Sequence, residues 1–357
     1  MQTLPKASAE LASIQEREET ALLNLPNVVG VGIGTKQKGE ADTRTPCITT
    51  LVSSKLPKSL LASTDLIPRC VGEKKTPTDV VEVGDFFAGG AGGNYSSYVQ
   101  EKSVHDSPIA NDDPSLLLPS ESGYNLGNLA DLLRRRIRPA QGGFSCGHYR
   151  ANAGTIATCC YDSDPFPSMP SRYYLLSTNL ILARSNDAKI GDPILQPGFN
   201  DGGVYPRDMI ARLTRFVPIK FSTACSKPIN YVDAAIAEGN LQDLDRKIYW
   251  GGHIKDLYAS PHVGDFVQKC GCATGFTTGR VTTINTTVDI YYGDSRKVRF
   301  AKQILATNMG KPGDSGSLVV NVDEHAVGLI IGGSSTTTVI NNILYIQRLL
   351  NVRLHEK

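Results

Sequence analysis

The sequence predicts a mainly β fold in which two antiparallel β-barrels, of about six strands each, follow a small α/β domain. Three observations predict this fold. Beyond residue 140, short apolar segments recur in two successive series with turn residues between them. Before residue 89, one amphipathic helix precedes three strand-like segments. A stretch rich in Gly, Asn, Asp and Pro separates the two regions.

We divide the chain accordingly into four parts. They are an accessory α/β domain at 1–88, a linker with a short helix at 89–140, a first barrel at 141–255, and a second barrel with a C-terminal helix at 256–357. The 357 residues suffice for several domains, and 40% apolar with 20% charged residues is ordinary for a globular protein. A net charge of +2 offers no field for nucleic acid or a membrane surface, so we expect neither as a partner.

The N-terminal domain begins with a helix predicted at 6–24, where leucine and isoleucine residues form one apolar face. The sequence VVGVGIG follows, and its glycines are spaced as in a dinucleotide-binding loop. Such a loop should open a helix, whereas the next residues, TKQKGE, are typical of a turn, which favours a glycine-containing strand. Two more strands are predicted at 46–52 and 79–83.

The linker contains GGAGG and NDDPS, and a short amphipathic helix that ends in three arginines is predicted at 126–133. The first series of strands is predicted at 154–160, 173–183, 210–218 and 230–237. The second series is predicted at 266–272, 279–292, 297–305, 317–321, 326–331 and 339–340, with an amphipathic helix around 344–350.

One loop of the second series carries the clearest chemical signal. In KPGDSGS, Ser315 lies between glycines, Asp314 precedes it, and an apolar strand follows. The two glycines allow a tight turn that exposes a nucleophile, and the amides of Gly313 and Ser315 could converge on a developing oxyanion. We expect the turn to bury Asp314, which would then need a positive or donor partner.

This loop resembles the nucleophile loop of the chymotrypsin-like (trypsin-like) serine proteases, and the resemblance extends over residues 140–357. It implies paired β-barrels, hydrolysis of peptide bonds through an acyl-enzyme on Ser315, a protein or peptide as substrate, and neither cofactor nor metal. The pattern of NVVGVGIG, a strand and TDVVEVG resembles the accessory unit that precedes some bacterial trypsin-like proteases.

The same resemblance places two further positions of a catalytic triad. Asp233, the one acid in NYVDAAIA, matches the aspartate that orients the base. The family pattern LSxNHVLA matches LSTNLILA here, so Leu180 stands where the histidine belongs, and the following GDPILQPG supports that register. Leucine cannot accept a proton, so we predict that this chain does not turn over peptide bonds.

Two explanations of the missing histidine remain open. The chain is either a protease inactivated by substitution, natural or engineered, or a pseudoprotease that binds peptides or proteins without catalysis. Intact Ser315, Asp314 and Asp233 favour recent or engineered loss, because a binding role has no evident need for all three. His148 lies just before the first barrel strand without the required strand-end context, so we interpret it as a packing or hydrogen-bonding residue.

The resemblance also implies where a substrate side chain would lie. Met309 falls at the floor of the pocket, and Ile331, Gly332 and Gly333 form its wall. No acid is available to pair with Arg or Lys, so we expect an apolar or small residue at the cleavage position. The glycine-rich wall suits an extended peptide that pairs as a strand.

The eight cysteines lie mostly in apolar strand-like segments. Neither the Cys-Cys pair nor the Cys-Gly-Cys sequence has the spacing of a zinc site, so we expect no metal. No apolar export signal is visible at the amino terminus, which favours free thiols and a cytoplasmic location.

Overall fold

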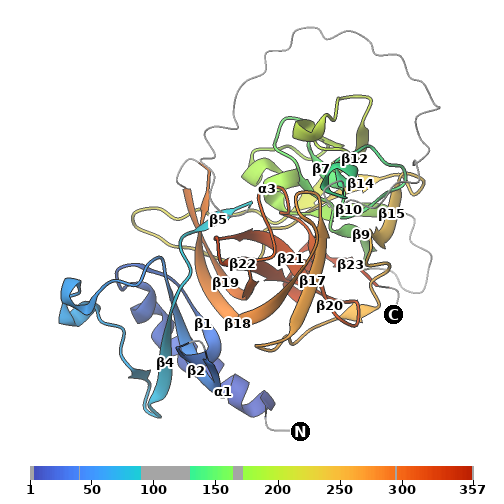
Figure 1. The fold of residues 1–357 in the computed structure, drawn as a ribbon. Helices are drawn as coiled ribbons and strands as arrows, with labels where there is room; N and C mark the ends of the chain where they lie inside the picture. The colour runs from blue at the N-terminus through green and yellow to red at the C-terminus, as the bar shows by residue number, and fades with distance from the viewer. Residues whose placement is uncertain (1–3, 40, 90–128, 164–171, 294–295, 356–357) are drawn as a thin grey trace.

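A computed structural model describes residues 4–39, 41–89, 129–163, 172–293 and 296–355 of the chain. These residues form a mainly β structure built on two large sheets (Figure 1). The predicted fold class is therefore confirmed. The linker predicted before residue 126 lies almost entirely outside the described residues. None of the described helices is long and apolar enough to span a membrane.

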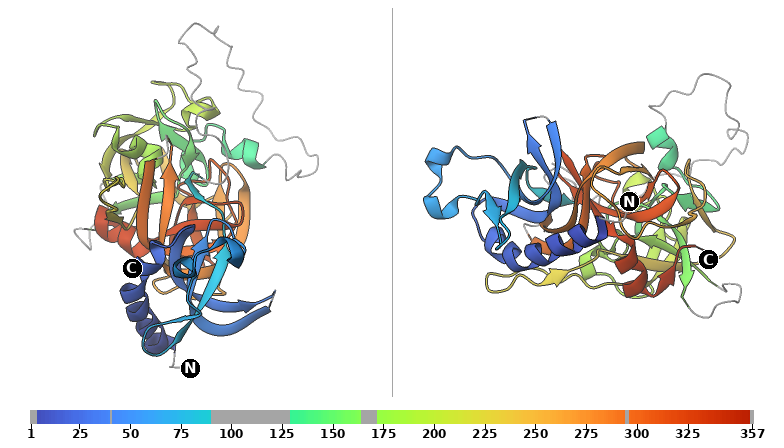
Figure 2. Two further views of the ribbon diagram at one scale, coloured as in Figure 1. Left: turned by 90° about the vertical axis from the view of Figure 1, so that its left-hand side faces the viewer. Right: turned by 90° about the horizontal axis from the view of Figure 1, so that it is seen from below.

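The N-terminal region consists of one helix and five strands. They are α1 (Leu4–Leu23), β1 (Val28–Lys38), β2 (Ala41–Val52), β3 (Cys70–Val71), β4 (Thr76–Glu82) and β5 (Phe86–Ala88), with 3-10 turns at Lys58–Leu60 and Ser63–Asp65. Helix α1 buries Ile14 and Leu22 against Val31 and Ile48 of the strands. Strand β1 pairs with β2 on one side and antiparallel with β18 on the other. The N-terminal strands thus extend a sheet of the C-terminal region, as Figures 1 and 2 show in blue and orange.

The first barrel region contains an eight-stranded sheet in the order β23-β9-β10-β14-β12-β11-β7-β8. Its strands are β7 (Ser145–His148), β8 (Gly154–Thr155), β9 (Thr158–Asp162), β10 (Tyr173–Ser177), β11 (Pro193–Leu195), β12 (Met209–Phe216), β14 (Ala235–Gly239) and β23 (Val352–Arg353). Strands β6 (Ala140–Gly142) and β15 (Leu244–Ile248) pair separately. Leu175, Ile194 and Ile236 belong to the fully buried core of this region.

The second barrel is a closed ring of strands. It comprises β17 (Phe266–Gly271), β18 (Gly275–Tyr292), β19 (Arg296–Thr307), β20 (Leu318–Asn321), β21 (His325–Gly333) and β22 (Thr337–Asn342). The order β19-β22-β21-β20-β17-β18 closes because β18 also pairs with β19. The short strands β13 (Ile229–Asn230) and β16 (Asp256–Leu257) pair with β19 and β21. Closure pairs the strands around the ring, while residues 331–333 of β21 extend beyond the pairing with β20.

The helices of the barrels are short. They are α2 (Leu129–Leu133), α3 (Asn179–Leu182) and α4 (Ile343–Leu350), with 3-10 turns at Arg184–Asn186 and Phe199–Asp201. The strand predicted at 173–183 ends earlier, at Ser177. The reason is local: the Thr178 side chain accepts a hydrogen bond from the Ile181 amide and so caps α3 at its start. The chain therefore turns helical where position 180 lies.

Candidate active site

The aspartate before the predicted nucleophile is fully buried and fully partnered. The Asp314 carboxylate accepts hydrogen bonds from the amides of Lys311, Ala273 and Thr274 and from the Thr274 hydroxyl. Its cationic partner is Lys269, whose Nζ lies 3.4 Å from Asp314 Oδ1 and whose side chain is also fully buried. Burial lowers the pKa of Lys269, and the Asp314 carboxylate opposes that shift. These bonds fix the loop immediately before Ser315.

The backbone of the nucleophile loop leaves two amides unpaired. Gly313 has a φ of +104°, a conformation that requires glycine. Its carbonyl oxygen accepts the Thr155 hydroxyl at 2.8 Å and the Cys272 thiol at 3.2 Å, which sets the orientation of this turn. Within the described residues, neither the Gly313 amide nor the Ser315 amide donates to another group of the protein. Two free amides two residues apart are what an oxyanion hole requires.

The sequence predicted that the turn would expose Ser315, and this is wrong, because the Ser315 side chain is buried at the barrel junction. Its hydroxyl lies next to another hydroxyl rather than a base. Ser315 Oγ lies 3.4 Å from Thr178 Oγ1, across the junction between the two barrels. The Ser315 carbonyl accepts the Thr155 amide at 2.8 Å, which ties the loop to β8 of the first barrel. Thr178 Oγ1 also caps α3, so this hydroxyl is held in place by the helix that carries position 180.

Leu180 lies beside the predicted orienting aspartate. It is the second residue of α3, and its amide donates to Asp233 Oδ1 at 3.1 Å. The half-buried side chain packs against the core of the first barrel and also against the apolar cluster of β5, β18 and β19. The structure therefore brings positions 178, 180 and 233 together at the barrel junction, next to Ser315.

Asp233 is fully buried, and its carboxylate already has donors on both oxygens. Oδ1 accepts the Leu180 amide, and Oδ2 accepts the Tyr292 hydroxyl at 2.6 Å. Its own amide donates to Asn341 Oδ1. Burial raises the pKa of Asp233 to about 6, while the bonds from Tyr292 and from the Leu180 and Asn179 amides oppose the rise. A tyrosine thus contributes the side-chain donor that Asp233 receives here.

Three residues of this site escaped the sequence reasoning. Tyr292 ends a strand far along the chain, and nothing in its neighbourhood signals a contact with Asp233. Thr178 was visible only as part of the motif around position 180. Lys269 offered a usable signal, because a lone lysine within the apolar segment FVQKCGC is a candidate partner for a buried aspartate.

The residues predicted for the substrate pocket lie in different surroundings. Met309 is buried in a cluster of the second barrel, and its backbone bonds to β18 and β22. Ile331 is fully buried in the cluster that contains Tyr292. Gly332 and Gly333 pair with β5, a strand from the N-terminal region. Their roles toward a substrate stay predictions.

His148 makes contacts of a structural kind. Its Nε2 lies 3.1 Å from Asp192 Oδ2, and its Nδ1 accepts the Arg150 amide. Burial lowers its pKa, and Asp192 opposes the shift. Because both ring nitrogens are engaged within the first barrel, His148 is not poised to take a proton from Ser315.

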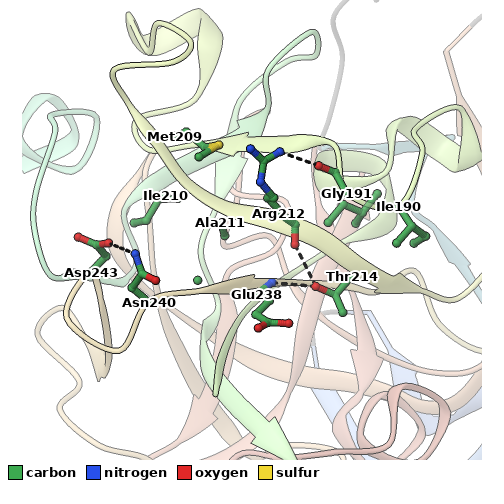
Figure 3. A pocket seen from close by; sticks show the side chains of 12 residues that line it. Ile190, Gly191, Met209, Ile210, Ala211, Arg212, Thr214, Glu238, Asn240 and Asp243 are labelled. Carbon is green, nitrogen blue, oxygen red and sulfur yellow. Dashed lines mark hydrogen bonds between the residues drawn. The ribbon is translucent and has the colours of Figure 1, made fainter. Parts of the chain in front are cut away.

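Other features of the described residues add no second site. An open cavity of 510 Å³ lies on β12 and β14, lined in part by Ile190, Met209, Arg212 and Glu238 (Figure 3). None of the predicted site residues lines it. All eight cysteines are unpaired, and burial raises the pKa of Cys270 and Cys272 to about 12. Within the described part of the chain, no three side chains are grouped to bind a metal ion.

Serine protease 2 of Streptomyces fradiae is 34% identical over 103 residues, which are 28% of this chain and 56% of that protein. The chain resembles the bacterial chymotrypsin-like serine proteases. It spans about half the length of this curated relative, and no model of a known protein family matches it.

Solved structures of low sequence identity are also similar to this chain over about 60% of its length. Thermobifida fusca Protease A has a TM-score of 0.41 at 14% identity, covering 60% of this chain and 96% of its own. The Cellulomonas bogoriensis chymotrypsin has a TM-score of 0.41 at 18% identity, covering 61% and 98%. Nocardiopsis protease has a TM-score of 0.41 at 17% identity, covering 60% and 97%.

Proposed function

We propose that residues 141–357 form a serine endopeptidase module whose acyl transfer would run through Ser315, and that this chain does not complete that reaction because Leu180 replaces the general base. A protein or peptide would be the substrate. The observation that carries the proposal is the 3.1 Å bond from the Leu180 amide to the buried Asp233 carboxylate. Position 180 is thereby next to the group that would orient an imidazole.

The remaining parts of the chemistry support this proposal. The unpaired Gly313 and Ser315 amides would stabilise the negative oxygen of a tetrahedral intermediate. The buried pair of Asp314 and Lys269 would hold the loop that carries both amides. A side chain at position 180 would have to take the Ser315 proton during attack and return it to the leaving amine, and leucine does neither. Loss of the base typically costs several powers of ten in rate.

A second candidate, a non-catalytic peptide-binding module, has one specific observation in its favour. The Tyr292 hydroxyl bonds to Asp233 Oδ2 at 2.6 Å, so the carboxylate is satisfied without an imidazole. Such a site would be stable as it stands. The pairing edge at Gly332 and Gly333 would then be the functional surface.

We also propose that the protein works in the cytoplasm. The support is that all eight thiols are unpaired and most are buried, a state that suits a reducing compartment.

Labelling with a fluorophosphonate tests the catalytic proposal. The unchanged chain should label negligibly, Leu180→His should gain labelling, and Leu180→His/Ser315→Ala should lose it again. Brisk proteolysis by the unchanged chain, abolished by Ser315→Ala, would show that another base serves Ser315 and would contradict the proposal.

A further inference from the structure

Strand β5 occupies an unusual place between two strands of the second barrel. It is parallel to β18, with Phe86 opposite Ile290, and antiparallel to β21, with Ala88 opposite Gly332. The Gly89 amide adds a hydrogen bond to the Ile331 carbonyl at 3.1 Å. In Figure 1, β5 leaves the N-terminal unit and lies beside the barrel near α3. A segment from outside the barrel region thus adds a strand to β21.

The edge that β5 covers continues directly from the candidate active site. The Gly316 amide donates to the Ile330 carbonyl, and the Ile330 amide donates to the Ser317 carbonyl. Residues 331–333 of β21 therefore begin at the nucleophile loop and run away from it. An extended peptide that pairs with this edge in the direction of β5 would be led toward the Ser315 site.

Glycine allows this close approach. A Cβ atom on Gly332 would overlap the carbonyl oxygen of Phe87, and one on Gly333 would overlap the carbonyl of Thr337. The edge thus accepts backbone at a separation that any side chain on Gly332 would prevent.

The side chains of β5 alternate as in a bound peptide with one inward face. Phe86 is fully buried and Ala88 nearly so, both within the cluster that includes Ile331 and Tyr292. Phe87 is 37% exposed and stacks on Tyr291 with ring centroids 5.7 Å apart. Leu180 packs against the same cluster. The site between β18 and β21 therefore receives a buried aromatic residue, a partly exposed residue, a small residue and a glycine, in that order.

We propose that residues 86–89 are an intramolecular ligand that closes the peptide-binding edge of β21, and that an extended peptide with an aromatic residue two positions before a small residue competes for this edge. The proposal rests on the proposed function, because it takes the edge beside Ser315 as the peptide site. A tethered ligand acts at an effective concentration of about millimolar or more, so a free peptide binds only when it exceeds this value or when β5 is released.

Two variants release β5 by different means, and a third is a matched control. Gly89→Pro removes the amide that donates to Ile331 and forbids the φ of +83°, without emptying any core position. Phe86→Ala removes the buried anchor. Asp85→Ala changes the exposed residue that immediately precedes β5 and should leave β5 in place.

The probe is a fluorescent peptide of sequence GDFFAGG, with a scrambled peptide for comparison, and binding is followed by fluorescence anisotropy. We expect the two releasing variants to bind GDFFAGG about tenfold or more tightly than the unchanged chain and Asp85→Ala do. A tenfold change corresponds to the loss of one strand contact of about 1.4 kcal/mol. Adding Gly332→Ala to Gly89→Pro should abolish the gain, because the new Cβ blocks any strand at that position. Equal binding by all folded variants, or a gain that Gly332→Ala leaves intact, would overturn the proposal.

Hydrogen exchange on the unchanged protein keeps the test valid if a variant does not fold. Excess GDFFAGG should speed exchange of the Gly89 amide while the scrambled peptide does not, and unchanged exchange at saturating peptide would also overturn the proposal. The proposed function fails independently. If the peptide competes with β5 but Leu180→His does not react with a fluorophosphonate, only the catalytic proposal is contradicted. If Leu180→His reacts but no peptide competes, only the ligand role of β5 is contradicted.

Discussion

The Tyr292 hydroxyl should limit what a restored histidine can achieve in this site. It donates to Asp233 Oδ2 at 2.6 Å, and both side chains are fully buried. An imidazole introduced by Leu180→His would need the same carboxylate to hold its Nδ1–H. We therefore expect Leu180→His to react slowly with a fluorophosphonate and Leu180→His/Tyr292→Phe to react faster, since phenylalanine keeps the packing of the ring and removes only the donor.

The size of the effect follows from one hydrogen bond to Asp233, for which the Tyr292 hydroxyl and the introduced imidazole would compete. A hydrogen bond to a charged group contributes about 1.5–3 kcal/mol, and partial competition for it corresponds to a rate change of about tenfold. The pH profile should also move. Burial raises the Asp233 pKa to about 6, and the Tyr292 bond opposes the rise, so Tyr292→Phe should raise that pKa further. As pH is lowered, Asp233 becomes protonated and labelling that needs the carboxylate is lost. This loss should occur at a higher pH in the double variant than in Leu180→His.

The assay is the second-order rate of Ser315 labelling between pH 5 and 8. Tyr292→Phe alone is the matched control and should stay unreactive, because Leu180 still supplies no base. Adding Ser315→Ala to the double variant should remove all labelling. Equal rates for the single and double variants at every pH would refute the competition between tyrosine and histidine for Asp233.

Three further measurements follow from the same contacts. As pH rises from 4 to 7, the free energy of unfolding of the unchanged chain should fall relative to that of Asp233→Asn. The folded pKa of about 6 exceeds the ordinary aspartate pKa of 3.8. The stability that Asp233 contributes is therefore present at low pH and is lost as pH rises through 6, by about 3 kcal/mol. A flat difference in urea unfolding across that range would contradict this. Gly313→Ala in the Leu180→His background should lower labelling about tenfold or more, because alanine strains the φ of +104° that aims the amide, and an unchanged rate would remove that amide from the mechanism. Titration of the denatured, non-reduced protein should recover all eight thiols, and four or fewer would contradict the cytoplasmic proposal.

The sequence predicted the fold class through local signals. Alternating apolar segments and turn residues identified strands such as β20 and β21, and the glycines around Ser315 identified the turn that leaves two amides unpaired. The motif around position 180 singled out Leu180 and Asp233 together, and in the structure the Leu180 amide donates to the Asp233 carboxylate; their roles in catalysis stay predictions. These features depend on residues that are close in the chain or carry a family motif.

What the sequence did not show depends on contacts between distant segments. Tyr292 reaches Asp233 across 59 positions, and its strand is apolar on one face like any other. The helical turn at position 180 follows from one threonine cap that overrides an apolar, strand-like segment. The place of β5 was unpredictable because a three-residue strand has no periodicity to read, and its pairing partners lie more than two hundred residues away.

Asp314 and Asp233 have contacts that explain their presence without any catalytic role. The presence of Ser315 is not explained in that way, so it is the stronger argument for catalysis. Asp314 neutralises the buried Lys269, so Asp314→Ala should destabilise the fold by about 3–5 kcal/mol, the cost of an uncompensated buried charge. Asp233→Ala would strand the Tyr292 hydroxyl and the Leu180 amide, at about 1–3 kcal/mol each. Both acids are thus needed by the fold whether or not the site is catalytic.

The Ser315 hydroxyl does not contribute comparably to the stability of the fold, because its contact with Thr178 Oγ1 is long at 3.4 Å. We expect Ser315→Ala to change the free energy of unfolding by less than about 0.5 kcal/mol in urea titrations. Ser315→Thr, which adds a methyl group to a fully packed site, is the matched control and should destabilise. A neutral Ser315→Ala would mean that this serine is kept for chemistry or binding at the cleft. A loss of 2 kcal/mol or more would instead assign it to the fold with the two acids, and would leave no residue of the site that argues for a recently active enzyme.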